Sequence, residues 1–215
     1  MTKKLYMEDP YLKEFEAVVL KINGSQVILD KTAFFAENGG QIGDTGHLNN
    51  TKVLDTKYDE NKENILHIME DGIGFREGDK VTGMIDWNRR YKIMKNHAAS
   101  HIMEYFLFKI FGVMKLVGTS VTEKHDSSTY ECPEALDQDK LKEVEMLANE
   151  FISKNYEIKR WEDPGKHGWW YWKSGEIMMP CGGTHPINVS EIGQISIKRK
   201  NGGKGKEKVL TSTIP

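Results

Sequence analysis

The chain has 215 residues, of which 38% are hydrophobic and 29% are charged, and its formal net charge is −2. This is a globular composition at a length that suits one large domain or two small ones. Because no apolar run approaches a membrane span and the N-terminus lacks the apolar core of a secretory signal, we expect a cytoplasmic protein without membrane contact. The two cysteines, Cys132 and Cys181, are too few for a disulfide scaffold, although one disulfide between them stays open.

The N-terminal part of the chain predicts β structure. Strand patterns at residues 14–22 and 25–30 flank Asn23-Gly24, which is a strong signal for a β-hairpin. Further short strand patterns, separated by turn sequences, lie at residues 46–55, 64–69 and 80–85. Several short strands at such spacing are typical of a small barrel, so we expect an N-terminal β-barrel domain over residues 1–87.

The remainder predicts helices mixed with strands. Residues 87–111 contain no proline or glycine and repeat apolar side chains at helical spacing. A second helix is expected at about residues 136–153, with Asp137 as its N-cap. Short strand-like segments lie at residues 116–130, 156–160, 169–173, 177–179, 192–198 and 207–211. We therefore expect residues 88–215 to form a two-layer α+β domain with a mostly antiparallel sheet.

The first helix carries His97 and His101, which lie one turn apart on the same face. The loop sequence CGGTH adds Cys181 and His185, and its glycines let the backbone bend. Imidazoles together with a thiolate form a donor set suited to Zn²⁺. We interpret the four residues as a zinc site. The alternative is that the histidines are core residues and that Cys181 is a small buried apolar side chain.

The residue after His97 excludes one class of zinc enzyme, and the other histidines offer no second metal site. A zinc protease helix needs a glutamate directly after its first histidine as general base. Ala98 stands at that position, so a zinc protease is excluded. The remaining histidines have no comparable partners, and we interpret them as surface or turn residues: His47, His67, His125 and His167.

Two more segments are distinctive. Residues 34–46 hold four glycines within eight positions, which predicts tight turns, but they lack the Lys-Ser/Thr ending of a phosphate-binding loop. Residues 197–208 hold six basic residues and one glutamate, a local charge of +5 against −7 for the rest of the chain. Such a patch fits contact with a polyanion such as RNA, the alternative being a solvated hairpin tip.

Taken together, three motifs carry a family resemblance. FFAENGGQIGDTG at 34–46, DWNRRYKIMKNHAASHIM at 86–103 and MPCGGTHP at 179–186 occur in this order and at these separations. In combination they closely resemble the editing domain of alanyl-tRNA synthetases and the free-standing AlaX family of trans-editing proteins, in its medium-sized type. The resemblance covers the chain from about Leu12 to Leu210.

The resemblance implies an enzyme, an aminoacyl-tRNA deacylase that hydrolyses mischarged tRNA(Ala) carrying serine, and sometimes glycine, at a Zn²⁺ site. His97, His101, Cys181 and His185 match the family's metal-binding motif. Gln41 matches a residue placed near the substrate. Thr119 matches a hydroxyl residue that recognises the serine side chain, with Ser120 as the other possible counterpart.

The basic segment would then hold the acceptor-stem backbone through its cationic side chains: Lys198, Arg199, Lys200, Lys204 and Lys206. One departure from the family pattern lies at residues 123–130, where the usual acidic-basic run is replaced by a different sequence. The sequence gives no indication of the oligomeric state.

Several alternatives stay open at this point. Either all four candidate ligands bind the metal and close the site in the resting state, or one histidine is displaced or lies behind the three ligands as a proton carrier. The competing function is a zinc-stabilised RNA-binding module without hydrolase activity, in which the metal contributes only folding free energy. A weaker one is a hydrolase of a small ester or amide.

Overall fold

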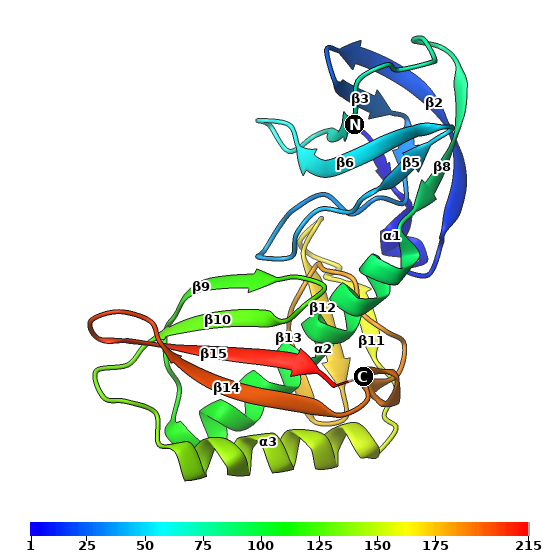
Figure 1. Ribbon diagram of the computed structural model, residues 1–215. Helices are drawn as coiled ribbons and strands as arrows, with labels where there is room; N and C mark the ends of the chain where they lie inside the picture. The colour runs from blue at the N-terminus through cyan, green and yellow to red at the C-terminus, as the bar shows by residue number, and fades with distance from the viewer. Residues whose placement is uncertain (215) are drawn as a thin grey trace. The chain divides into compact units, whose positions relative to one another are not determined.

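The computed structural model describes residues 1–214. By their internal contacts, the residues divide into two compact units, Met1–Tyr91 and Lys92–Pro215, each with its own hydrophobic core (Figure 1). The helix α2 (Trp87–Phe111) begins in the first unit and continues through the second. The domain limits expected from the sequence, 1–87 and 88–215, remain a prediction about where independently folding parts separate.

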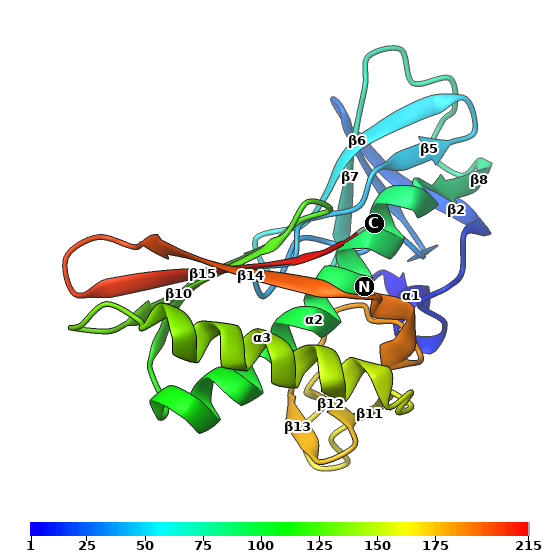
Figure 2. The ribbon, with the colours of Figure 1, turned by 60° about the horizontal axis from the view of Figure 1, so that its bottom comes forward.

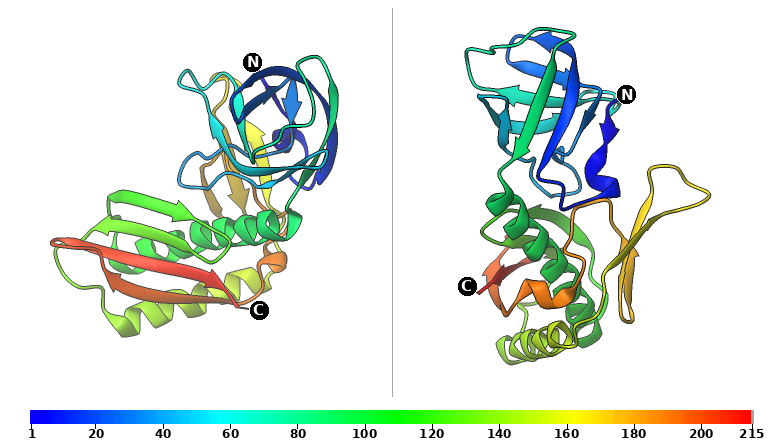
Figure 3. Two further views of the ribbon diagram at one scale, coloured as in Figure 1. Left: turned by 45° about the horizontal axis from the view of Figure 1, so that its top comes forward. Right: turned by 90° about the vertical axis from the view of Figure 1, so that its right-hand side faces the viewer.

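The first unit is built around a closed barrel, which Figure 3 shows end-on, with the strand order β2-β3-β7-β6-β5-β8. Its strands are β2 (Glu14–Asn23), β3 (Gln26–Leu29), β5 (Gly46–Leu48), β6 (Thr51–Tyr58), β7 (Ile65–Met69) and β8 (Lys80–Ile85). Alternate residues of each strand point into the barrel, and these inward positions are apolar in most strands. The short strands β1 (Lys3–Lys4) and β4 (Lys31–Thr32) pair in parallel, and α1 (Leu5–Glu8) follows β1. The expected small barrel is therefore confirmed.

One expected strand of the barrel is in fact two. Residues 46–55 form the whole of β5 and the start of β6, and these two strands pair antiparallel with Leu48 opposite Thr51. Asn49 sits in the connecting turn with φ of 50°. Asparagine tolerates this left-handed conformation better than most residues, so Asn49-Asn50 was the signal for the turn.

The second unit is a two-layer α+β structure, as expected. Its larger sheet has the order β14-β15-β10-β9, and α2 and α3 (Gln138–Ser153) lie along one face of it (Figure 2). The strands are β9 (Leu116–Val121), β10 (Asp126–Glu131), β14 (Ile195–Asn201) and β15 (Lys206–Thr213), all paired antiparallel. Asp137 caps α3 by accepting from the backbone N–H groups of Asp139 and Lys140.

A smaller antiparallel sheet, β11-β12-β13, completes the second unit (Figure 3, right). It consists of β11 (Lys159–Glu162), β12 (Trp170–Ser174) and β13 (Ile177–Pro180). The strand expected at 192–198 starts later than its sequence suggests. Asn188 and Glu191 form a capping box around a 3-10 helix at Val189–Ile192, and β14 begins only at Ile195.

Two surface properties complete the description. None of the helices in the described part of the chain combines the length and apolar character that a membrane crossing requires.

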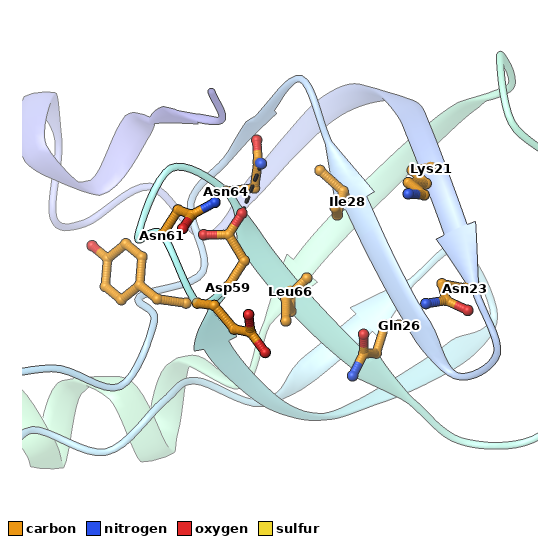
Figure 4. Close-up of a pocket in the computed structure, with 10 residues that line it drawn as sticks. Lys21, Asn23, Gln26, Ile28, Asp59, Asn61, Asn64 and Leu66 are labelled. Atoms are coloured by element: carbon orange, nitrogen blue, oxygen red, sulfur yellow. Dashed lines mark hydrogen bonds between the residues drawn. The ribbon is translucent and has the colours of Figure 1, made fainter.

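A groove of about 640 Å³ lies on the barrel, beside the β2–β3 hairpin and β7 (Figure 4). Asn64 Nδ2 donates to Asp59 Oδ2 at 2.8 Å in its wall, and amide and carboxylate groups dominate its lining. The groove contains no histidine or cysteine.

Candidate metal centre

The second unit brings His97, His101, Cys181 and His185 together. The central part of α2 presents the two helical histidines, and its neighbours Ala98 and Ala99 are fully buried, which fixes the rotation of the helix. Cys181 follows β13 directly, and its backbone N–H donates to the carbonyl of Trp170 at 2.8 Å. The loop is thereby tied to the β12–β13 hairpin as it turns toward α2.

One potential ligand atom from each of the four side chains lies within 4.8 Å of all the others. The sulfur of Cys181 is 3.2 Å from His185 Nε2 and 3.5 Å from His97 Nε2. The imidazole of His101 lies next to them, with its ring centroid 4.8 Å from that of His97 and 5.0 Å from that of His185. The Trp172 ring packs beside His101 and is fully buried.

Burial dominates the electrostatics of this cluster. Desolvation lowers the pKa of His101 to about 3 and lowers the pKa of His97 and His185 well below the usual value. Neighbouring imidazoles lower the pKa values of His97 and His185 further. Burial raises the pKa of the Cys181 thiol to about 11, against the opposing effect of the Gly183 N–H. Three neutral imidazoles and a thiol are therefore packed together in the protein.

The side chains fit a bound metal ion in three respects. His101 Nε2 is buried and has no hydrogen-bond partner, an arrangement that a directed ligand bond would explain. Donor atoms in a tetrahedral zinc site lie about 3.3–3.6 Å apart, close to the two sulfur–nitrogen distances measured here. Mixed nitrogen and sulfur donors are the set that zinc favours. The cluster is therefore able to hold a metal ion.

Gln41 lies in the first unit, within the glycine-rich stretch at residues 34–46, and its side chain is fully buried. Asn38 and Gln41 exchange both backbone hydrogen bonds at 3.0 Å across a tight turn. The two central residues, Gly39 and Gly40, have φ of 59° and 86°, which explains why the turn contains glycine.

A buried ion pair that the sequence did not reveal fixes this glycine-rich stretch. Arg90 Nε donates to Asp44 Oδ1 at 2.9 Å, and a second contact joins Arg90 Nη2 to Asp44 Oδ2. Arg90 Nη2 also donates to the carbonyl of Ala33 at 2.7 Å, and the Phe35 N–H donates to Asp44 Oδ2 at 2.6 Å. Both charged side chains are fully buried. The start of α2 therefore holds both ends of the stretch from Ala33 to Asp44.

Thr119 lies on β9 of the second unit and is half-buried, whereas Ser120 is exposed on the opposite face of the strand. The Thr119 hydroxyl donates to Asp126 Oδ1 at 3.4 Å, and the Ser128 hydroxyl donates to the other oxygen, Oδ2, at 2.9 Å. Ser100, on α2 between His97 and His101, is a further hydrogen-bond partner of this carboxylate. The segment at 123–130, which departs from the family pattern, thus contributes a buried acid next to the residue expected to recognise serine.

The five basic residues expected to bind tRNA lie on the β14–β15 hairpin. Lys198, Lys200, Lys204 and Lys206 are exposed, and the structure shows no ion pair for them among the described residues. Arg199 differs, because its guanidinium group forms a two-point ion pair with Glu207 on the neighbouring strand. Its charge is therefore partly neutralised within the hairpin.

One of the sequence interpretations needs correction. His67 is not a surface residue but is fully buried on the inner face of β7. Its Nδ1 lies 3.0 Å from the Val27 carbonyl, which can only accept, so Nδ1 carries the proton and Nε2 accepts from Thr32 Oγ1 at 2.8 Å. The structure also closes the alternative of a disulfide, because both Cys132 and Cys181 are free thiols.

Comparison with known proteins places the chain in a family. Residues 4–89 match the family described as tRNA synthetases class II (A). The alanyl-tRNA editing protein AlaX-M of Pyrococcus horikoshii is 36% identical over 97% of this chain and 96% of its own length. The chain belongs to the AlaX-M family of alanyl-tRNA editing proteins. The AlaX-M protein of Saccharolobus solfataricus agrees, with 35% identity over the full length of both chains.

The chain is also similar to part of the alanyl-tRNA synthetases. The alanine–tRNA ligase of Sulfurisphaera tokodaii is 35% identical over 91% of this chain, which corresponds to 24% of the ligase. An AlaX-M chain thus matches one quarter of a much longer enzyme, as the resemblance to a synthetase editing domain implies. The family relationship expected from the three motifs is confirmed.

Proposed function

We propose that this chain is a trans-editing hydrolase that deacylates mischarged tRNA(Ala), chiefly Ser-tRNA(Ala) and in addition Gly-tRNA(Ala), at a zinc site. The observation that carries the proposal is the convergence of His97, His101, Cys181 and His185 in a chain of the AlaX-M family. An isolated pair of helical histidines would support a metal site only weakly. Donors from a helix and from a distant loop within 4.8 Å support it much better.

We assign Zn²⁺ to the four-residue cluster because its donors are nitrogen and sulfur with no carboxylate among them. When bound, zinc supplies a Lewis acid for an ester carbonyl and lowers the pKa of water. The chain's own contribution is to hold the ligands. Trp172 packs against the His101 ring, and the Gly183 N–H donates to the Cys181 sulfur at 3.4 Å.

The structure bears on the two arrangements of ligands that the sequence left open. His185 Nδ1 is buried without a hydrogen-bond partner, whereas its Nε2 faces the Cys181 sulfur. That Nε2 lies 3.2 Å from the sulfur, within the cluster of four potential ligand atoms, which is where a ligand nitrogen would be placed. We therefore favour His185 as a ligand rather than as a proton carrier.

Editing is needed because a binding pocket discriminates poorly between small amino acids of similar shape. A pocket for alanine cannot strongly reject an isostere that only adds a hydroxyl, and one missing methylene is worth only about 1–3 kcal/mol. A second, hydrolytic site can be strict for serine if it hydrogen-bonds the hydroxyl, since alanine leaves those polar groups unpaired. We assign this recognition to Thr119, and we assign Gln41 to the substrate from the family resemblance.

The tRNA would bind to the basic hairpin β14–β15. Four exposed lysines project from a short segment of this hairpin. Their ammonium groups can bind phosphate groups of the tRNA backbone, a contact that does not depend on the nucleotide sequence. Arg199 contributes less in this proposal, because Glu207 already holds its guanidinium group.

A deacylation assay tests the proposal. Serine-, glycine- and alanine-charged tRNA(Ala) would be incubated with the protein and with the variants His101→Ala and Cys181→Ala, each checked for folding by circular dichroism. We expect rapid loss of serine, slower loss of glycine and retention of alanine, with folded variants that are inactive. If all three esters persist while the protein binds zinc and tRNA, the zinc-stabilised RNA-binding module takes the place of the hydrolase. Cleavage of small esters with sparing of all charged tRNA would favour the third alternative instead.

A further inference from the structure

The second unit contains a buried carboxylate without a counter-ion. Asp126 is fully buried on the face of β10 that packs toward α2, and it forms no ion pair with any described residue. Burial, with a smaller contribution from Glu104 on α2, raises its pKa to about 7 against the opposing effect of its hydrogen bonds from hydroxyl groups. A buried acid without a basic partner costs folding free energy, so its retention needs an explanation from its hydrogen bonds.

Among the described residues, the hydrogen-bond partners observed for the Asp126 carboxylate are hydroxyl groups. Ser128 occupies Oδ2 at 2.9 Å and Thr119 occupies Oδ1 at 3.4 Å, while Ser100 approaches from α2. At pH 8, above this pKa, the carboxylate is ionised and can only accept, so each hydroxyl that bonds to it donates its single hydrogen to Asp126. Ser100 and Ser128 are buried, and Thr119 is the one of the three that remains partly exposed.

The orientation of the Thr119 hydroxyl follows from this network. Once its hydrogen points at Asp126, only its lone pairs are available to any other molecule, and Thr119 becomes an obligatory acceptor. A serine side chain can donate to such an acceptor. An alanine side chain cannot donate. It would shield the Thr119 oxygen from water without supplying a hydrogen bond in its place.

We propose that Asp126 is a positioning residue for specificity: it orients the Thr119 hydroxyl as an acceptor and thereby selects a hydroxyl-bearing aminoacyl group. This inference rests on the proposed function and deepens it. Asp126 does not touch the substrate and acts through Thr119. Glycine has no side chain to place against Thr119, so binding of a glycyl group is independent of the orientation.

Binding measurements with non-hydrolysable analogues test this proposal. The probes are adenosines that carry seryl, alanyl or glycyl groups through a 3′-amide, titrated calorimetrically into the full chain at pH 8. We expect the wild-type protein to bind the seryl probe about tenfold more tightly than the alanyl probe. In Asp126→Asn this preference falls to about twofold, whereas affinity for the glycyl probe changes by less than about twofold.

Three further variants separate positioning from mere stability. Thr119→Val loses the same preference, and adding it to Asp126→Asn causes no further loss, because the two residues act as one unit. Thr129→Val replaces a hydroxyl on the opposite face of the same strand and keeps the tenfold preference. Asp126→Asn and these variants are each checked for folding by circular dichroism before titration, so that an unfolded protein is not mistaken for a specificity effect.

The outcomes are distinct. If Asp126→Asn keeps the seryl preference while Thr119→Val loses it, Thr119 acts alone and the proposal is wrong. If Asp126→Asn weakens all three probes equally, the role of Asp126 is structural. If the wild-type protein binds none of the probes, the proposed function itself fails, and this inference fails with it.

Discussion

Arg90 is the best place to test the structural account of the first unit. Replacing it by methionine keeps much of the side-chain length but removes the guanidinium group that pairs with Asp44. Asp44 would then be a fully buried carboxylate that keeps the hydrogen bond from the Phe35 N–H at 2.6 Å but has lost its cationic partner. The Ala33 carbonyl would also lose the donor that lies at 2.7 Å.

The expected loss is large. Removing one partner of a buried ion pair costs about 3–5 kcal/mol, because the other charge stays buried without compensation. Converting Asp44 to asparagine as well removes that charge, so the double variant Asp44→Asn, Arg90→Met should regain about 1–2 kcal/mol over Arg90→Met alone. As a matched control, Asp139→Ala breaks the exposed ion pair with Lys142 and should leave the stability close to that of the wild type.

The assay combines urea unfolding, followed by circular dichroism at pH 7, with hydrogen exchange of the peptides that cover residues 33–46. Because the chain has two compact units, exchange in the barrel strands identifies the transition that belongs to the first unit. We expect faster exchange at the Phe35 and Asp44 amides in Arg90→Met. An Arg90→Met protein within 1 kcal/mol of the wild type, or a double variant less stable than the single one, would refute the reasoning.

Further predictions concern the barrel and the basic hairpin. Burial lowers the pKa of His67 to about 4, below its ordinary value in the unfolded chain. The free energy of unfolding of the barrel should therefore decrease by about 3 kcal/mol as the pH falls from about 6.5 to 4. Urea titrations of His67→Gln should show a smaller pH dependence. Gly43→Ala should destabilise by more than about 2 kcal/mol, because the added methyl would lie 2.1 Å from the Thr56 carbonyl oxygen. Lys204→Gln with Lys206→Gln should weaken tRNA binding at low salt and reduce the salt slope by about 2; unchanged binding would exclude the hairpin as the tRNA contact.

The sequence predicted best those elements whose signals are local. Helix α2 runs from Trp87 to Phe111, as its helical spacing and its lack of proline and glycine indicate. The cap at Asp137 was likewise predicted from residue type and position. The four ligand candidates converge as expected, because a helical turn and a glycine-bent loop both constrain where side chains point.

Long-range pairing was out of reach of the same reasoning. Nothing near Asp44 or Arg90 in the sequence shows that they meet, because the contact depends on how the barrel closes against the start of α2. His67 was different, since a signal was present. It alternates with Ile65 and Met69 on β7, and the two-residue period places all three on the buried face.

The measurement that tests the central claim most directly is the metal dependence of Ser-tRNA(Ala) hydrolysis. The protein would be depleted of metal with a chelator, assayed, and assayed again after stepwise addition of Zn²⁺, with the metal content and the circular dichroism spectrum recorded at each step. We predict that hydrolysis disappears with the metal and returns fully at about one Zn²⁺ per chain, while the fold is retained throughout. Undiminished hydrolysis by the folded, metal-free protein would contradict the account, as would zinc binding at the four residues without any hydrolysis.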